Sequence, residues 1–327
     1  MDIAYLLAGW GWTYPEIANG CQTLERLGFD ICYFGDDLFP HPQLDATVYD
    51  TWTILPAVAA LTQRMKLGSL VSPAGRRHPG LFAKITTGVD QISGGRLVVG
   101  MGAGNAEEQQ HSLHQPFLPA AERVAMLVEE LTILESMWTE NRTTFAGEHH
   151  SVTDAICSPK GAGGRRPEVL VALKNARLLA PVAGRLADRA NLLGNDDDAV
   201  RRLADAIRNE AQKAGRSGDE IVMGRLFQVL FTETKVARDD VEGVLTRRAA
   251  EIGVEPEELI EYHTHVASYV GPPEGAARAI LERTRDIGIE EVVLNIDTVG
   301  MLEHRRTIEG LDILAEYVLP ELRHPSS

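Results

Sequence analysis

The chain has 327 residues and a mass of 35.8 kDa, and 44% of its residues are hydrophobic, which is enough for a substantial core and excludes a disordered chain. Its 32 basic and 47 acidic residues give a formal net charge of −15, which argues against nucleic-acid binding as the main task. No apolar run approaches the roughly 18 residues that span a bilayer, and the first residues lack the basic region of a signal peptide. We therefore expect a cytoplasmic globular protein without nucleic-acid or membrane partners.

Apolar runs typical of strands alternate with amphipathic helical stretches along the whole chain. Strands are predicted over residues 3–8, 31–35, 65–71, 96–101, 169–173, 190–193, 221–232 and 291–296. Helices are predicted over residues 14–27, 50–61, 80–92, 120–138, 176–186 and 198–214, in a divided region from 239 to 287, and over 303–322. Most of the strands lack polar alternation, as parallel strands buried on both faces do.

This alternation predicts an α/β protein, a (β/α)8 TIM barrel formed by residues 1–327 as a single domain. The additional length falls mainly in insertions near residues 104–164 and 236–273. A doubly wound parallel sheet has the same alternation and stays an alternative. In a barrel, functional side chains follow the carboxyl ends of the strands, so the search for a site begins there.

Two acids and a histidine follow the second predicted strand. Asp36, Asp37 and His41 lie in the sequence GDDLFPHP, and such groups at the mouth of a barrel can do acid–base chemistry. The alternative is a solvated turn in which the aspartates cap the next element.

Cations follow the third predicted strand. Arg76, Arg77 and His78 can hold a phosphate or a carboxylate, or can simply flank a helix that starts at Pro79.

Glycines at alternate positions follow the fourth predicted strand, at Gly100, Gly102 and Gly104. They allow the backbone to approach a flat ligand closely, although glycine also relieves crowding within a barrel strand. The spacing differs from the dinucleotide-binding GxGxxG pattern. Elsewhere, His263 and His265 lack an evident third ligand, so no metal site is expected.

Three pieces of sequence between residues 35 and 117 resemble the luciferase-like monooxygenase family, which includes oxidoreductases that depend on the deazaflavin coenzyme F-420. The pieces are LDATVYDTWTILPAVAALTQRMKL at 44–67, RHP at 77–79 leading through Lys84 to DQISGGR at 90–96, and GMGAG at 100–104. Segments at 167–171, 185–191 and 292–296 also fit the family.

The resemblance implies a TIM barrel, a homodimer, and a flavin or deazaflavin at the carboxyl-end mouth with its ring against the third strand. It also implies a non-prolyl cis peptide bond, for which the matching position is Ser69–Leu70. The cofactor-binding residues expected from it are Asp36, Ser69, Leu70, Val71, Arg76, Arg77, Gly102, Ala103, Gly104, Ala172, Leu173, Lys174, Asn175, Ala176 and Arg177.

The chain departs from the family at three candidate catalytic positions. Members commonly have Asp-His where this chain has Asp36-Asp37. In the sugar-phosphate dehydrogenases of the family, a Glu stands where this chain has Asn105, and a Trp where it has His41. The mechanism of those enzymes therefore does not transfer intact, and the hypothesis is that Asp37 or His41 replaces the missing acid–base group.

The leading functional prediction is an F-420-dependent oxidoreductase that transfers a hydride to or from a small organic substrate. The alternative is an FMN-dependent monooxygenase that uses dioxygen and receives reduced flavin from a separate reductase. A third reading is a flavin-binding barrel that has lost catalysis. The sequence leaves the identity of the substrate open.

Overall fold

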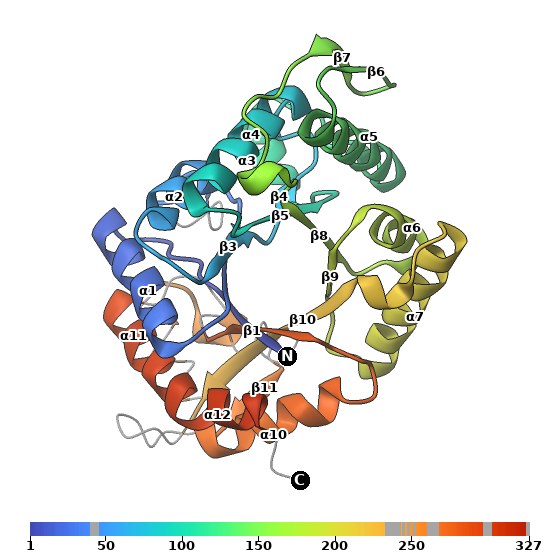
Figure 1. Ribbon diagram of the computed structural model, residues 1–327. Coiled ribbons are helices and arrows are strands. Elements are labelled where there is room, and N and C mark those ends of the chain that lie inside the picture. The colour runs from blue at the N-terminus through green and yellow to red at the C-terminus, as the bar shows by residue number, and fades with distance from the viewer. Residues whose placement is uncertain are drawn as a thin grey trace.

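Eight parallel strands close into a barrel (Figure 1) in this computed structural model, which describes residues 1–39, 46–232, 243, 246, 249–250, 253–259, 268–296 and 303–324. The strands are β1 (Asp2–Leu6), β2 (Ile31–Phe34), β3 (Lys66–Ser69), β5 (Leu97–Gly102), β8 (Glu168–Leu173), β9 (Arg189–Leu192), β10 (Val222–Phe231) and β12 (Glu291–Asn295). Strand β1 pairs with β2 and β12, and β10 pairs with both β9 and β12, so the sheet is closed. The predicted TIM barrel is confirmed, and the open doubly wound sheet is excluded.

Helices surround the barrel in the predicted order. They are α1 (Tyr14–Leu27), α2 (Thr51–Ala59), α3 (Pro79–Ser93), α5 (Ala120–Thr139), α6 (Ala176–Leu186), α7 (Asp197–Lys213), α10 (Pro273–Thr284), α11 (His304–Ile313) and α12 (Leu319–Arg323). The last predicted helix, 303–322, is divided because a π-helical turn, η3 (Leu314–Val318), separates α11 from α12. None of the helices in the described ranges is both long and apolar enough to span a bilayer.

Several short helices and strands were not predicted from the sequence. They are β4 (Ser72–Pro73), α4 (Glu107–Ser112), β6 (Thr143–Ala146), β7 (Ser151–Ala155), η1 (Ala162–Gly164), η2 (Gly218–Glu220) and β11 (Tyr269–Gly271). The two- and three-residue pieces are too short to show a hydrophobic period, which is the main signal of secondary structure in a sequence. The sequences of α4, β6 and β7 (EEQQHS, TTFA and SVTDA) are mostly polar and contain no apolar run.

The core has an outer and an inner part. The larger part lies between the helices and the outward side chains of the strands, such as Ile3 and Val99. The smaller part fills the barrel itself and contains inward side chains such as Ala4, Val98 and Leu170. The barrel is therefore a packed core with room for a site only near its ends.

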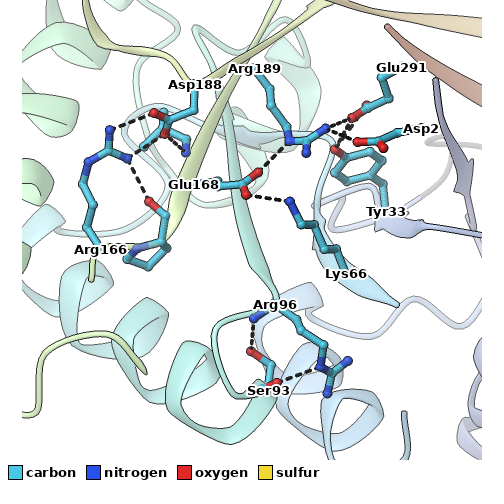
Figure 2. A network of polar contacts seen from close by, with 12 residues as sticks. Asp2, Tyr33, Lys66, Ser93, Arg96, Arg166, Glu168, Asp188, Arg189 and Glu291 are labelled. Atoms are coloured by element: carbon cyan, nitrogen blue, oxygen red, sulfur yellow. Dashed lines mark hydrogen bonds and ion pairs between the residues drawn. The ribbon is translucent and has the colours of Figure 1, made fainter. Parts of the chain in front are cut away.

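An ion-pair layer occupies the amino ends of the strands (Figure 2). The Arg189 guanidinium contacts Glu168 at 2.6 Å, Glu291 at 2.5 Å and Asp2 at 3.1 Å. Lys66 contacts the other oxygen of Glu168 at 2.6 Å. Each of these five residues is the first residue of its strand, so the layer closes the amino end of the barrel.

The insertion after β5 carries the antiparallel β6–β7 hairpin, which projects beyond the ring of helices near α5 (Figure 1). The Glu129 carboxylate of α5 accepts backbone N–H groups of residues 148, 149 and 150 at 2.7, 2.9 and 2.8 Å. The adjacent Glu130 accepts the Gly75 N–H at 2.7 Å and lies 2.9 Å from the His150 ring. Helix α5 therefore joins the hairpin to the loop that follows β4.

Candidate active site

A cavity of about 410 Å³ opens at the carboxyl ends of the strands. Its wall comes from the ends of β1, β2, β3, β5, β8 and β9, from the middle of β10, and from β4, α4 and α6. The lining residues are Leu6, Gly35, Asp36, Asp37, Leu70, Val71, Pro73, Arg76, Gly102, Ala103, Gly104, Asn105, Ala106, Gln109, Gln110, Ala172, Lys174, Leu179, Leu193 and Leu226. Most of the wall is aliphatic or small, and the polar groups gather near β2, β4 and α4.

The backbone leaves the β3 ladder next to this cavity. Ser69 still pairs with Phe34 of β2, and the Leu70 N–H still donates to the Phe34 carbonyl at 2.7 Å. The non-prolyl cis bond joins Leu70 to Val71, so the predicted position, Ser69–Leu70, is wrong by one residue. The reason is that both Ser69 and the Leu70 N–H remain engaged with β2, which leaves the next bond as the place where the strand turns away.

Glycines of β5 leave room for the segment from Ser69 to Val71. A Cβ at Gly100 would lie 1.8 Å from the Ser69 carbonyl oxygen, and one at Gly102 would lie 2.9 Å from Val71 Cγ2. Gly104 has a φ of +77°, where side chains are disfavoured. The Arg123 guanidinium supports the loop, because its Nε donates to the carbonyls of residues 103 and 104 at 3.2 and 3.1 Å.

Asp36 is neutralised by its neighbour. Arg77 donates Nη1 to Asp36 Oδ2 at 2.5 Å and Nη2 to Oδ1 at 3.1 Å, and it also pairs with Asp50. Although burial opposes it, these two carboxylates raise the pKa of Arg77. Both terminal nitrogens of the Arg77 guanidinium therefore bind Asp36 or Asp50, and the residue does not line the cavity.

Asp37 has a different environment. Its Oδ1 accepts a hydrogen bond from the neutral Gln109 amide at 3.1 Å, and the residue lies on the cavity wall. Burial raises the pKa of Asp37, the charge of Asp36 raises it further, and Gln109 and Arg76 only partly oppose this. A carboxyl whose pKa is raised in a cavity is suited to proton transfer.

Arg76 supports the same polar corner. Its Nη1 donates to the Asp36 carbonyl at 2.9 Å and its Nη2 donates to Gln109 Oε1 at 3.0 Å. Burial lowers the pKa of Arg76, with the surrounding carboxylates opposing the shift. The side chain therefore organises the wall through Asp36 and Gln109.

The cavity wall contains most of the residues singled out from the sequence. They are Asp36, Asp37, Leu70, Val71, Arg76, Gly102, Ala103, Gly104, Asn105, Ala172 and Lys174. Ser69 and Leu173 are buried behind the wall, and Asn175, Ala176 and Arg177 lie beyond it at the start of α6. His41, His263 and His265 are outside the described residues, within which no group of three or more potential metal ligands occurs.

Sequence reasoning missed the contribution of α4. Gln109 and Gln110 of this helix line the cavity, and both are buried. The six-residue helix begins with Glu107 and Glu108, an acidic first turn that favours a helix start. That signal predicts a helix but gives no indication that Gln109 reaches residues 72 positions away.

The cavity residues fit a flat ring with a polar edge. One wall consists of the Gly102–Gly104 backbone and Val71, where added side chains would occupy the available space. Gln110 Oε1 is buried in the wall and has no hydrogen-bond partner among the described residues. Such an acceptor is costly to leave unpaired, so it suits a donor on the edge of a bound ring.

A sequence model of luciferase-like monooxygenases matches residues 11–292. The chain belongs to the luciferase-like monooxygenase family. An F-420-dependent glucose-6-phosphate dehydrogenase of Nakamurella multipartita is 31% identical to this chain over 330 residues. The match covers 94% of this chain and 92% of that enzyme. An enzyme of the same description from Microbacterium testaceum is 27% identical over 332 residues, covering 94% and 93%.

Solved structures of the luciferase-like fold superpose on nearly the whole chain. An F-420-dependent secondary alcohol dehydrogenase, solved with an F-420–acetone adduct, has a TM-score of 0.80 at 17% identity, covering 98% of this chain and 99% of that one. A monooxygenase from Streptomyces bottropensis has a TM-score of 0.77 at 19% identity, with the same coverage. At these identities the likeness establishes the fold of the barrel.

Proposed function

We propose that this luciferase-like oxidoreductase uses coenzyme F-420 to exchange a hydride with a small organic substrate that carries a hydroxyl or carbonyl group. The observation that carries the proposal is the cavity at the carboxyl ends of the strands, where a glycine wall faces a carboxyl of raised pKa, Asp37. The full-length relatives described as F-420-dependent dehydrogenases support the choice of cofactor.

The chain offers suitable contacts to both parts of the cofactor. Val71 and the Gly102–Gly104 backbone provide a surface for the ring, and Gln110 provides an acceptor at its edge. Lys174 and Arg177 flank the first turn of α6, are exposed, and form no ion pair with other described residues. A helix start with two free cations favours an anion, so we assign them to the acidic tail of the cofactor. When bound, F-420 supplies a two-electron hydride carrier that reacts poorly with dioxygen.

Asp37 handles the proton in this proposal. Reduction of a carbonyl to an alcohol requires a proton on oxygen, and oxidation releases the same proton. Asp37 gives up the proton in one direction and accepts it in the other, which replaces the histidine that many family members carry after the second strand. Arg77 holds Asp36 as its fixed partner, so the two adjacent carboxyls have separate tasks.

Fluorescence titration of the purified protein with F-420 and with FMN tests the cofactor. We expect tight binding of F-420, weak binding of FMN, and at least about tenfold weaker F-420 binding in Lys174→Ala/Arg177→Ala, because two charge contacts are lost. Asp37→Asn should bind F-420 normally but lose about 10²-fold or more in turnover.

Two results would overturn the proposal. Tight FMN binding with weak F-420 binding would indicate a monooxygenase supplied with reduced flavin by a separate reductase. F-420 binding without turnover on any alcohol or carbonyl compound of a broad panel would indicate a barrel that has lost catalysis.

A further inference from the structure

Gln109 connects three parts of the cavity wall through a complete set of hydrogen bonds. Its Oε1 accepts the Leu38 N–H at 3.1 Å and Arg76 Nη2 at 3.0 Å. Its Nε2 donates to Asp37 Oδ1 and to the Phe39 carbonyl, both at 3.1 Å. The side chain is buried, and its two ends together make four bonds.

These partners allow only one orientation of the amide. A guanidinium and a backbone N–H can only donate, so the oxygen of Gln109 must face Arg76 and Leu38. The Phe39 carbonyl can only accept, so the nitrogen must face the other way. Rotating the amide by 180° would set donors against donors at one end and acceptors against each other at the opposite end.

This orientation determines where Asp37 carries its proton. Because Nε2 donates to Asp37 Oδ1, that oxygen acts as an acceptor in both protonation states. A carbonyl oxygen accepts better than a hydroxyl oxygen, so the proton of the neutral acid is favoured on Oδ2. That oxygen lies over Gly35, where a Cβ would come within 2.7 Å of it, so the absence of a side chain at Gly35 keeps its position open.

We propose that Gln109 is a positioning residue that, oriented by Arg76, reserves Asp37 Oδ1 as an acceptor and leaves Oδ2 as the oxygen that exchanges the proton. The proposal rests on the role given to Asp37 under the proposed function. In the part of the chain that the structure describes, the charged groups that act on Asp37 are Asp36 on its own loop and Arg76 from the loop after β4, and Arg77 and Asp50 lie behind Asp36.

Infrared difference spectra of the apoprotein test the proposal without any cofactor. The carbonyl band of the protonated carboxyl is followed against pH, and the spectra of Asp37→Asn identify the part that belongs to Asp37. In Gln109→Glu, one oxygen still accepts from Leu38 and Arg76 while the other faces Asp37, so the two carboxyls compete for a proton. We expect the last proton of this pair to leave about one pH unit or more above the wild-type midpoint.

Gln109→Met removes the donor without adding a charge. The carboxylate of Asp37 then loses a hydrogen bond, so the midpoint should again move upward. Gln110→Glu is the matched control, because it adds the same charge to a buried position on the same helix and no hydrogen bond joins Gln110 to Asp37 among the described residues. We expect a clearly smaller shift there. Circular dichroism and thermal melts establish that each variant is folded.

An unchanged midpoint in folded Gln109→Glu, or an equal shift in Gln110→Glu, would overturn the positioning role. Because the titration uses apoprotein, this failure differs from failure of the proposed function, which would show as absent F-420 binding or turnover. With loaded enzyme, Gln109→Glu and Gln109→Met should move the pH limb of kcat in the same direction as the infrared midpoint, while the affinity for F-420 changes little.

Discussion

Asp36 and Asp37 are adjacent in sequence, but their partners give them different chemistry. Asp36 faces a bidentate guanidinium, whereas Asp37 faces a neutral amide and a desolvating wall. A paired carboxylate of the first kind stabilises structure, and a carboxyl of the second kind is available for proton transfer. At the scale of single residues, the contacts of each carboxyl therefore decide whether it stabilises the structure or can transfer a proton.

Asp37→Asn should stabilise the protein in a pH-dependent way. Burial raises the pKa of Asp37 above its ordinary value of 3.8, so ionisation of this group in the folded state lowers stability as the pH rises through the raised pKa. The variant does not ionise there and keeps an oxygen that can accept from Gln109. Its free energy of unfolding in urea should equal that of the wild type near pH 3.5 and exceed it near pH 8.

The control for this measurement is Asp198→Asn, which changes an exposed carboxyl of α7 that pairs with Arg201. If Asp37→Asn were less stable than the wild type by the same amount at every pH, the raised pKa would be contradicted.

Sequence reasoning singled out Asp37 and the glycines because barrel topology places strand ends together, and these residues line the cavity, whereas their functional roles stay predictions. It did not find Gln109, since the role of that side chain arises from contacts with a segment 72 residues earlier. Arg77 was predicted to bind the cofactor, and that prediction stays untested; in the structure it pairs with Asp36 and Asp50, two carboxylates of the β2–α2 connection, and no local sequence pattern indicates that pairing.

Among the elements, the β6–β7 hairpin depends most on a single side chain. A two-stranded hairpin is marginal by itself, and here Glu129 fastens its turn through three backbone N–H bonds. The space that the carboxylate uses exists because residue 147 is glycine, where a Cβ would lie 2.4 Å from Glu129 Oε2. Partial burial raises the pKa of Glu129, but the backbone bonds outweigh this and lower it.

Glu129→Gln should loosen the hairpin turn while the barrel stays intact. The amide that replaces the carboxylate has one acceptor oxygen, so it cannot accept all three backbone donors with charge-assisted strength. Hydrogen exchange measured by mass spectrometry should become about tenfold faster or more in peptides covering residues 147–151, and stay unchanged in β5 and β8. Glu122→Gln, an exposed position on the same helix, should leave both regions as they are.

Prediction of elements succeeded where local signals were strong. The bounds of α1 agree with the sequence because Thr13 and Glu16 cap its start and Gly28, with a φ of +91°, ends it. The third strand was predicted through residue 71, but β3 ends at Ser69, since the apolar run continues past the point where the backbone turns away. The hairpin was missed because a distant carboxylate, and no hydrophobic period, defines it.

At the scale of the whole molecule, the stability of the barrel depends on the paired charges at its amino end. Arg189 is 7% exposed and Glu291 is 1% exposed, and Tyr33 donates a hydrogen bond to that carboxylate at 3.2 Å. Burial raises the pKa of Glu291, and Arg189 opposes the rise. Buried ion pairs contribute little compared with apolar packing, but losing one partner leaves a costly unpaired charge.

Arg189→Met should destabilise the protein by about 3–5 kcal/mol, because Glu291 is left buried without its cation. Adding Glu291→Gln should recover part of that loss, since the unpaired charge disappears. Urea unfolding measures both. Arg201→Met, which breaks an exposed pair with Asp198, should cost less than about 1 kcal/mol. Equal losses in the two single variants would contradict a special role for the ion-pair layer.

We propose that the chain forms a homodimer through the outer face of α3. Leu81 and Ile92 are 59% and 53% exposed, and Ile85 and Gly88 continue the same stripe at helical spacing. A Cβ at Gly88 would meet nothing within 4 Å, so a second helix has room to approach. Exposed apolar stripes of this kind mark contact surfaces.

Leu81→Glu/Ile92→Glu should convert the dimer into a monomer with an unchanged melting profile of the barrel. Light scattering coupled to gel filtration gives the mass directly. Leu61→Glu, at an exposed apolar residue beyond α2, serves as the control and should leave the mass unchanged. A wild-type mass near 35.8 kDa would contradict the dimer.

The ion-pair layer also bears on the order in which molecules bind to the cavity and leave it. Arg189 and its partners fill the amino end of the barrel, Val98, Leu170 and Val293 pack above them, and the cavity described above opens at the opposite end. We therefore expect molecules to enter and leave this cavity from the carboxyl end of the barrel. Of two molecules that bind there together, we expect the deeper one to bind first and to leave last, which is an ordered kinetic mechanism.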